Sequence, residues 1–289
     1  MEIQVPLILF TTFLAWSAGT FGSLALCAAK GKATHTQIPG LIVTLVLLGI
    51  GGISVCFHLA QPLHIFNGFG NPTSGITQEL VAIVIMVIWM VVYFSFLRRN
   101  DNKVPLWCSI IAVIIAAALV IVMAHSYMMS ARPAWNNILQ IVSLVGAACA
   151  LGPATVAVMA SKFDPDDELS LQIIAGSAVG ALTTIVYCIA MSCVNGDYTT
   201  IGYNFDPTEP NKALFDSSTV ISPFAGDALL PTMIALVCVI VAVVVAFVGK
   251  KGGKWRIPST AIVVLSFAAA VALRITFYVM GNTLYGFFL

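Results

Sequence analysis

Charged side chains are scarce in this chain of 289 residues. Lys, Arg, Asp and Glu together make up 9% of it, whereas hydrophobic residues make up 60%. The mean hydropathy is +1.00. Soluble globular domains carry about 25% charged residues, so this composition excludes a soluble domain and predicts an integral membrane protein.

Motifs of several chemical classes are missing as well. The seven cysteines show none of the paired spacings that bind zinc or iron–sulfur clusters. The sequence has no Gly-rich phosphate loop, no nucleophile elbow and no basic nucleic-acid patch. We therefore expect no metal held by this chain itself, no covalent cofactor and no nucleic-acid partner.

Long apolar runs dominate what remains. A helix needs about 20 apolar residues to cross a hydrocarbon core of roughly 30 Å. Eight runs reach that length, and Pro, Gly or charge clusters interrupt the chain between them. The sequence predicts a single all-α transmembrane domain over residues 1–289, with spans at about residues 5–29, 40–60, 79–97, 104–128, 136–160, 169–193, 226–249 and 257–285.

The basic residues are unevenly divided between the two sets of connecting loops. The first, third, fifth and seventh loops contain ten of the 13 Lys and Arg residues, and the other loops contain only Arg132 and Lys212. Cytoplasmic loops are enriched in Lys and Arg. We therefore expect both termini, and the long loop at residues 194–226, to be extracytoplasmic in a cytoplasmic membrane.

Four ionisable residues lie in or at the ends of the predicted spans, namely His58, Glu79, His125 and Arg274. Such groups are costly in a bilayer and are functional candidates unless they reach water at the interface. The span limits place all four in the outer half of the membrane. Snorkelling toward water is an equally good explanation for His125 and Arg274, and a weaker one for His58 and Glu79.

A histidine and a carboxylate at a lipid-accessible site suit proton transfer. A quinol must lose two protons as its two electrons depart, while its isoprenoid tail stays in the lipid. We therefore predict that His58 accepts a quinol proton and that Glu79 relays it to water or fixes the imidazole. Asn67 is a candidate donor to the ring oxygen, and Arg274 is a candidate supporting cation.

The segment CFHLAQPLHIFNG at residues 56–68, followed by Glu79 at the head of the next span, resembles the signature region of the membrane anchor subunit of dimethyl sulfoxide reductase. The eight-span layout with both termini outside is similar to that family, and so is RITFY at residues 274–278. The sequence departs from the family pattern two residues before Tyr127, where His125 stands in place of an arginine.

The resemblance implies a role in anaerobic respiration. An anchor of this family binds menaquinol and passes its electrons to an iron–sulfur subunit, which supplies a molybdopterin catalytic subunit. The family's quinol-site histidine and glutamate correspond to His58 and Glu79, and Tyr278 belongs to the similar segment of the last span. The metal centres would then belong to the partner subunits.

Three alternatives stay open. His58 and His125 lie at comparable depth and could ligate one haem between two spans. A secondary transporter would show internal repeats and broken helices near the midplane. A quinone-linked anchor of another molybdoenzyme, for example a polysulfide reductase, would share the features described above, because the catalytic subunit selects the final substrate.

Overall fold

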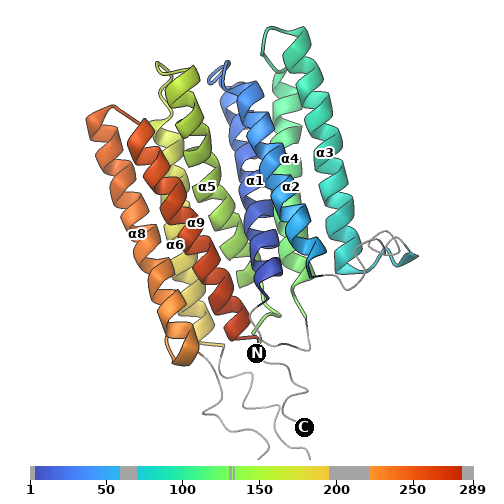
Figure 1. Ribbon diagram of the computed structural model, residues 1–289, viewed down its shortest axis with the longest axis vertical. Helices are drawn as coiled ribbons and strands as arrows, with labels where there is room; N and C mark the ends of the chain where they lie inside the picture. Colours follow the sequence, from blue (N-terminus) through green and yellow to red (C-terminus); the bar gives the residue numbers. More distant parts are fainter. Residues whose placement is uncertain (1–3, 59–69, 130–131, 133, 195–221, 282–289) are drawn as a thin grey trace, which may run out of the picture.

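A computed structural model describes residues 4–58, 70–129, 132, 134–194 and 222–281 of the chain. Within these residues, eight helices are long and apolar enough to cross a membrane. They stand side by side with their axes roughly aligned (Figure 1). The chain is therefore a multi-pass helical membrane protein.

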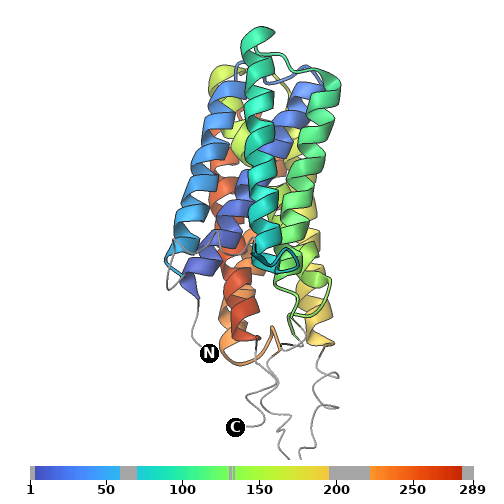
Figure 2. The same cartoon turned by 90° about the vertical axis from the view of Figure 1, so that its right-hand side faces the viewer.

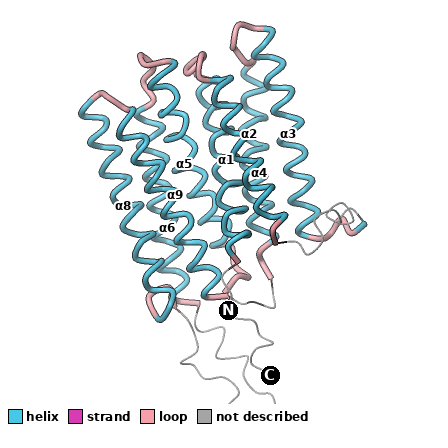
Figure 3. The backbone as a smooth tube through the Cα atoms, viewed as in Figure 1, coloured by secondary structure: helices cyan, strands magenta, loops and turns pink. Residues whose placement is uncertain are grey.

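The helices follow one another with short connections at one end of the bundle. Their bounds are α1 Val5–Ala29, α2 Gln37–Cys56, α3 Gly75–Arg99, α4 Leu106–Ser126, α5 Leu139–Phe163, α6 Ser170–Ser192, α8 Leu229–Gly252, which follows the 3-10 turn η3 Gly226–Ala228, and α9 Arg256–Val279. Successive helices run in opposite directions (Figures 1 and 3).

Several helix limits differ from those predicted from hydropathy. Helix α2 begins at Gln37 rather than near residue 40, because Pro39 lies in the first turn, where a missing N–H group costs nothing. It ends at Cys56, so His58 lies beyond the helix and not inside a span. Helix α3 begins at Gly75 rather than near residue 79. Its first turn is polar, so hydropathy alone does not mark it as part of the helix.

Helix α1 is the centre of the bundle and packs against α2, α4, α5 and α9. The contact with α5 is close because glycines on both helices leave room for the backbones. A Cβ atom on Gly19 would lie 2.1 Å from the Ala148 carbonyl oxygen, and one on Gly152 would lie 2.2 Å from the Gly19 carbonyl oxygen. Viewed from the side, α3 stands in front of the bundle between α2 and α4 (Figure 2).

The loops with the basic residues gather at one end of the molecule. The connections α1–α2, α3–α4, α5–α6 and α8–α9 all lie at the upper end in Figure 3. This end, called the basic end below, carries the ten Lys and Arg residues that the sequence assigns to these loops. The opposite end contains the C-terminal ends of α2, α4 and α9 and the start of α3.

Two loops at the basic end are joined by Asp164. One carboxylate oxygen accepts hydrogen bonds from the Thr36 backbone N–H at 2.8 Å and from its hydroxyl at 2.6 Å. The other accepts from the His35 backbone N–H at 3.2 Å and lies 2.8 Å from the His35 Nδ1 atom. Burial raises the pKa of Asp164, but these hydrogen bonds outweigh it and hold the pKa below its ordinary value.

Candidate functional site

Glu79 lies in the second turn of α3 at the end of the bundle opposite the basic end, and its side chain is 7% exposed. Its carboxyl group contacts the Ser126 hydroxyl at the last residue of α4. The Ser126 oxygen also lies 2.8 Å from the Met123 carbonyl oxygen. The Ser126 hydroxyl thus links the Glu79 carboxyl group on α3 to the last turn of α4.

Arg274 is buried in α9 near the same end, with 2% of its surface exposed. Its Nη2 atom donates to the Gln140 amide oxygen at 2.8 Å and to the Ser143 hydroxyl at 3.1 Å, both on α5. The guanidinium group lies 4.5 Å from the centre of the Phe277 ring. Its buried Nη1 atom has no hydrogen-bond partner among the described residues.

Tyrosine side chains connect the surroundings of Glu79 and Arg274. Tyr127, which follows Ser126, and Tyr278 both contact the Phe277 ring edge-on, with ring centroids 6.2 and 5.2 Å from it, and the Arg274 guanidinium lies over the same ring. On the α6 side, the Tyr187 hydroxyl lies 3.4 Å from the Gln140 amide nitrogen. We call Glu79, Ser126, Tyr127, Gln140, Ser143, Tyr187, Arg274 and Tyr278 the polar cluster.

The segment between α4 and α5 fixes the end of α9 that carries Arg274 and Tyr278. Trp135 is stacked on Phe277 with the ring centroids 4.4 Å apart. Its indole N–H donates to the Phe277 carbonyl oxygen at 2.8 Å. The Arg132 guanidinium covers the Trp135 ring and also donates to the Gly281 carbonyl oxygen. These contacts hold the polar side chains of α9 in place.

A groove between α3 and α4 leads toward Glu79 from within the bilayer. Its volume is about 450 Å³. Its lining is mostly apolar, with side chains such as Ile85 on α3 and Val122 on α4. Thr77 and Gln78 line the groove and directly precede Glu79 in α3. Val122 lies one helical turn before Ser126 in α4. The polar end of the groove therefore lies at the same end of the α3–α4 pair as Glu79, although Glu79 itself does not line it.

The two candidate histidines have different surroundings from Glu79. His58 is exposed just beyond α2, where its backbone N–H donates to the Val55 carbonyl oxygen at 3.0 Å. His125 is exposed near the end of α4. Both lie at the same end of the bundle as Glu79 (Figure 1). Among the described residues, no hydrogen bond or ion pair joins His58 to Glu79.

The structure thus unites three of the five predicted site residues, Glu79, Arg274 and Tyr278, in one cluster. It places His58 at the same end without a described contact to them, and Asn67 lies outside the described residues. Sequence reasoning missed Gln140 and Ser143. Their spacing of three puts two polar side chains on one face of an apolar helix, which is a signal that the sequence contains.

Fold and cluster together define a multi-pass helical membrane protein with buried polar groups at one end of the bundle. The model of the family "DMSO reductase anchor subunit (DmsC)" matches residues 1–280. The chain belongs to this family of dimethyl sulfoxide reductase anchor subunits, as the resemblance in the sequence predicted.

A curated relative agrees with this assignment. It is the C subunit of the anaerobic dimethyl sulfoxide reductase of Haemophilus influenzae (strain ATCC 51907 / DSM 11121 / KW20 / Rd), which is 29% identical over 147 residues. The matched part covers 47% of this chain and 51% of the relative. The match therefore spans about half the length of the relative.

Proposed function

We propose that this membrane anchor binds and oxidises menaquinol in a cytoplasmic membrane and passes the electrons to an iron–sulfur subunit. That partner would supply a molybdopterin catalytic subunit, which reduces dimethyl sulfoxide in anaerobic respiration. Membership of the anchor family supports the assembly. The observation that carries the quinol chemistry is a buried carboxyl group, Glu79, next in the chain to Thr77 and Gln78, which line the polar end of a lipid-accessible groove.

The groove between α3 and α4 suits a quinol that arrives from the lipid. Its apolar walls would receive the isoprenoid tail and the ring, and its polar end would bring the ring hydroxyls toward Glu79. Rim side chains such as Gln78 and Val81 are exposed, so entry requires no separation of the helices. A fixed position near the proton acceptor lowers the entropic cost of the reaction.

The proton chemistry uses two acceptors at this end of the bundle. Oxidation of one quinol forms one quinone and releases two protons and two electrons. His58 accepts a hydroxyl proton and returns it to water, because its side chain is exposed. Glu79, whose carboxyl group is in contact with Ser126, is the second group that takes up and releases a proton. The electrons leave to the partner's iron–sulfur centre.

Arg274 has a supporting part in this proposal. Its cationic group is held by Gln140 and Ser143, and its field reaches Tyr127 and Tyr278. A fixed positive charge favours the anionic forms that a quinol passes through when it loses protons. The Nη1 atom has donors to offer to a ring oxygen or to a water molecule.

The partner subunits would dock at the end of the bundle opposite the basic end. His58, Glu79 and Arg274 all lie there, so electrons would reach the partner over a short path. If the basic end faces the cytoplasm, as the distribution of Lys and Arg predicts, this surface is extracytoplasmic. Both chain termini would lie on the same side.

Substitution of His58 tests the proposal. In the purified complex we expect His58→Ala to assemble normally and to oxidise a menaquinol analogue at least about tenfold more slowly, which corresponds to about 1.4 kcal/mol at the barrier. His125→Ala is the matched control, because it removes another exposed histidine from the same end of the bundle. Equal quinol kinetics in the two variants would remove His58 from the mechanism.

A further inference from the structure

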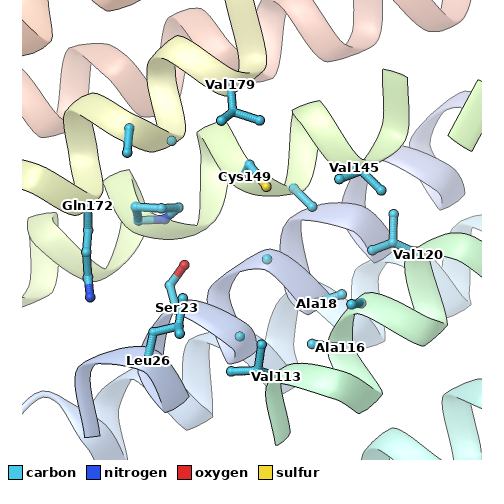
Figure 4. A pocket seen from close by; sticks show the side chains of 17 residues that line it. Ala18, Ser23, Leu26, Val113, Ala116, Val120, Val145, Cys149, Gln172 and Val179 are labelled. Carbon is cyan, nitrogen blue, oxygen red and sulfur yellow. The ribbon is translucent and has the colours of Figure 1, made fainter. Parts of the chain in front are cut away.

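A second groove lies on another side of the bundle and is unrelated to the polar cluster. Its volume is about 340 Å³. Helices α4 and α6 form its walls, and α1 and α5 form its floor (Figure 4). Leu26 is 44% exposed here, although it belongs to the central helix α1. The groove thus opens the middle of the bundle to the surrounding lipid.

The size of this groove limits what can occupy it. A water-sized group takes about 30 Å³, so the groove has room for roughly eleven methylene-sized groups. From Val145 to Pro153 on α5, the lining extends over about 12 Å at the helical rise. A helix is about 10–12 Å across and does not fit into this volume. A single hydrocarbon chain does fit.

The groove is apolar along its length but polar at the end near the basic end. Gln172, in the first turn of α6, lines that end. The Cys27 thiol donates to the Gln172 amide oxygen at 3.1 Å, which leaves the amide nitrogen as a donor toward the groove. Figure 4 shows this nitrogen at the free end of the side chain, with the Ser23 hydroxyl also directed into the cavity.

A positive charge stands just beyond the polar end. Lys30 is exposed and lies one helical turn past Leu26, near Cys27. Three charged neighbours on the adjoining loops are bound within the protein, whereas Asp166 is exposed. Lys32 donates to the Glu168 carbonyl oxygen at 2.7 Å, the Glu168 carboxylate accepts from Ser170 at 3.0 Å, and the Asp167 carboxylate accepts from the backbone of Ala33.

We propose that this groove binds one glycerophospholipid of the membrane leaflet at the basic end. One acyl chain fills the groove along α1, the Gln172 amide nitrogen donates to an ester carbonyl, and Lys30 pairs with the phosphate. Along the groove, apolar side chains such as Val120 are followed by the Gln172 amide and then by the Lys30 charge. A phospholipid has the matching order of acyl chain, ester and phosphate. This site is separate from the α3–α4 groove and does not depend on the quinol proposal.

Native mass spectrometry of the purified complex tests this inference, with palmitoyl-oleoyl phosphatidylglycerol supplied in the detergent. We expect one phospholipid retained per anchor subunit. Ala175→Phe places a ring in the groove from an exposed position on α6, and it should weaken lipid binding by about tenfold in Kd, equivalent to 1.4 kcal/mol of affinity. Ala178→Phe is the control on the same helix, exposed but outside the groove.

Two milder changes address the head group. Gln172→Leu should weaken retention without filling the groove, and Lys30→Gln should do the same, whereas Lys250→Gln, at the same end of the bundle, should leave it unchanged. The thermal unfolding midpoint of each variant shows whether it is folded. Added lipid should raise this midpoint in the native protein and in Ala178→Phe, but not in Ala175→Phe.

Several results would overturn the inference. They are full retention of the phospholipid in Ala175→Phe, equal loss of it in Ala178→Phe, or no retained lipid in the native protein. If the native protein instead retains a molecule with the mass of a quinone, and Ala175→Phe displaces it, then the groove binds a quinone and not a phospholipid. Quinol kinetics measured on the same variants stay independent, because neither alanine lines the α3–α4 groove.

Discussion

Glu79→Gln is the substitution that separates proton transfer from packing at the polar cluster. Glutamine has nearly the same size as glutamate, and its amide oxygen accepts a hydrogen bond, so it keeps the contact with the Ser126 hydroxyl. It cannot take up or release a proton. Any loss of activity in this variant therefore measures the need for a titrating group at this buried position, which is only 7% exposed.

The expected effect of Glu79→Gln on stability is small, and its expected effect on the rate of quinol oxidation is large. A volume-conserving change that keeps its hydrogen bond costs about 1 kcal/mol or less of stability, which is about 2–4 °C in the unfolding midpoint of a chain of this size. General acid–base catalysis contributes about 10²–10⁴-fold to a rate. Glu79→Gln should therefore slow menaquinol oxidation at least about tenfold, or about 1.4 kcal/mol at the barrier, while the complex unfolds almost as before.

The assay is oxidation of a menaquinol analogue by the purified complex over a range of pH, with assembly checked by size-exclusion chromatography. Ser126→Ala is the control, because it keeps the carboxyl group and removes only its contact, and we expect its rate to stay within about threefold of the native value. If Glu79→Gln assembles and oxidises quinol within twofold of the native rate, the relay through Glu79 is refuted.

Three further predictions concern the rest of the molecule. Gln140→Leu removes a hydrogen bond of 2.8 Å to the buried Arg274 charge, so it should cost about 2 kcal/mol, or about 4–8 °C in the unfolding midpoint. Asp164→Ala should destabilise the protein at neutral pH by about 1–2 kcal/mol, as the loss of a helix cap does. Proteoliposomes containing the whole complex should develop no membrane potential during quinol-driven turnover, because proton release and the proposed docking surface lie at one end of the bundle.

Each of these predictions has a control or a contrary outcome. For Gln140→Leu the control is Thr260→Val on α9, which removes an exposed hydroxyl that, among the described residues, bonds to Arg256 of its own helix, so its midpoint should not change measurably. The pKa of Asp164 is lowered in the folded protein, so its contribution is present above the unfolded value of about 4 and is lost as the pH falls through the folded pKa. An Asp164→Ala effect that persists below that range contradicts this account. A potential that builds up in the proteoliposomes contradicts the placement of the partners.

The eight membrane helices could be predicted from the sequence because each is a long apolar run between polar turns. The predicted ends were less accurate where the physical signal was not hydropathy. Helix α3 starts at Gly75, four residues before the apolar run that begins near Glu79, because a polar turn can be helical. Helix α2 stops at Cys56, so the histidine predicted inside the span lies beyond its end.

Glu79 and Arg274 could be selected from the sequence as well, because a buried charge in a membrane helix requires a reason. Their neighbours could not be selected in that way. Ser126, Gln140 and Tyr187 are uncharged, and they belong to three different helices whose arrangement the sequence does not specify. The packing of α5 against α6 and α9, and of α3 against α4, brings these side chains to their partners.

The contacts within the polar cluster follow from the cost of burying charge. Arg274 is 2% exposed, and such a group is stable only when oxygen atoms surround its donors. Gln140 and Ser143 supply two of these oxygens, yet the Nη1 atom lacks a partner among the described residues. A site designed only for stability would satisfy this atom or replace the arginine by an apolar residue. An unsatisfied donor near the phenols of Tyr127 and Tyr278 is instead suited to a polar ligand that comes and goes, and a quinol ring has that property.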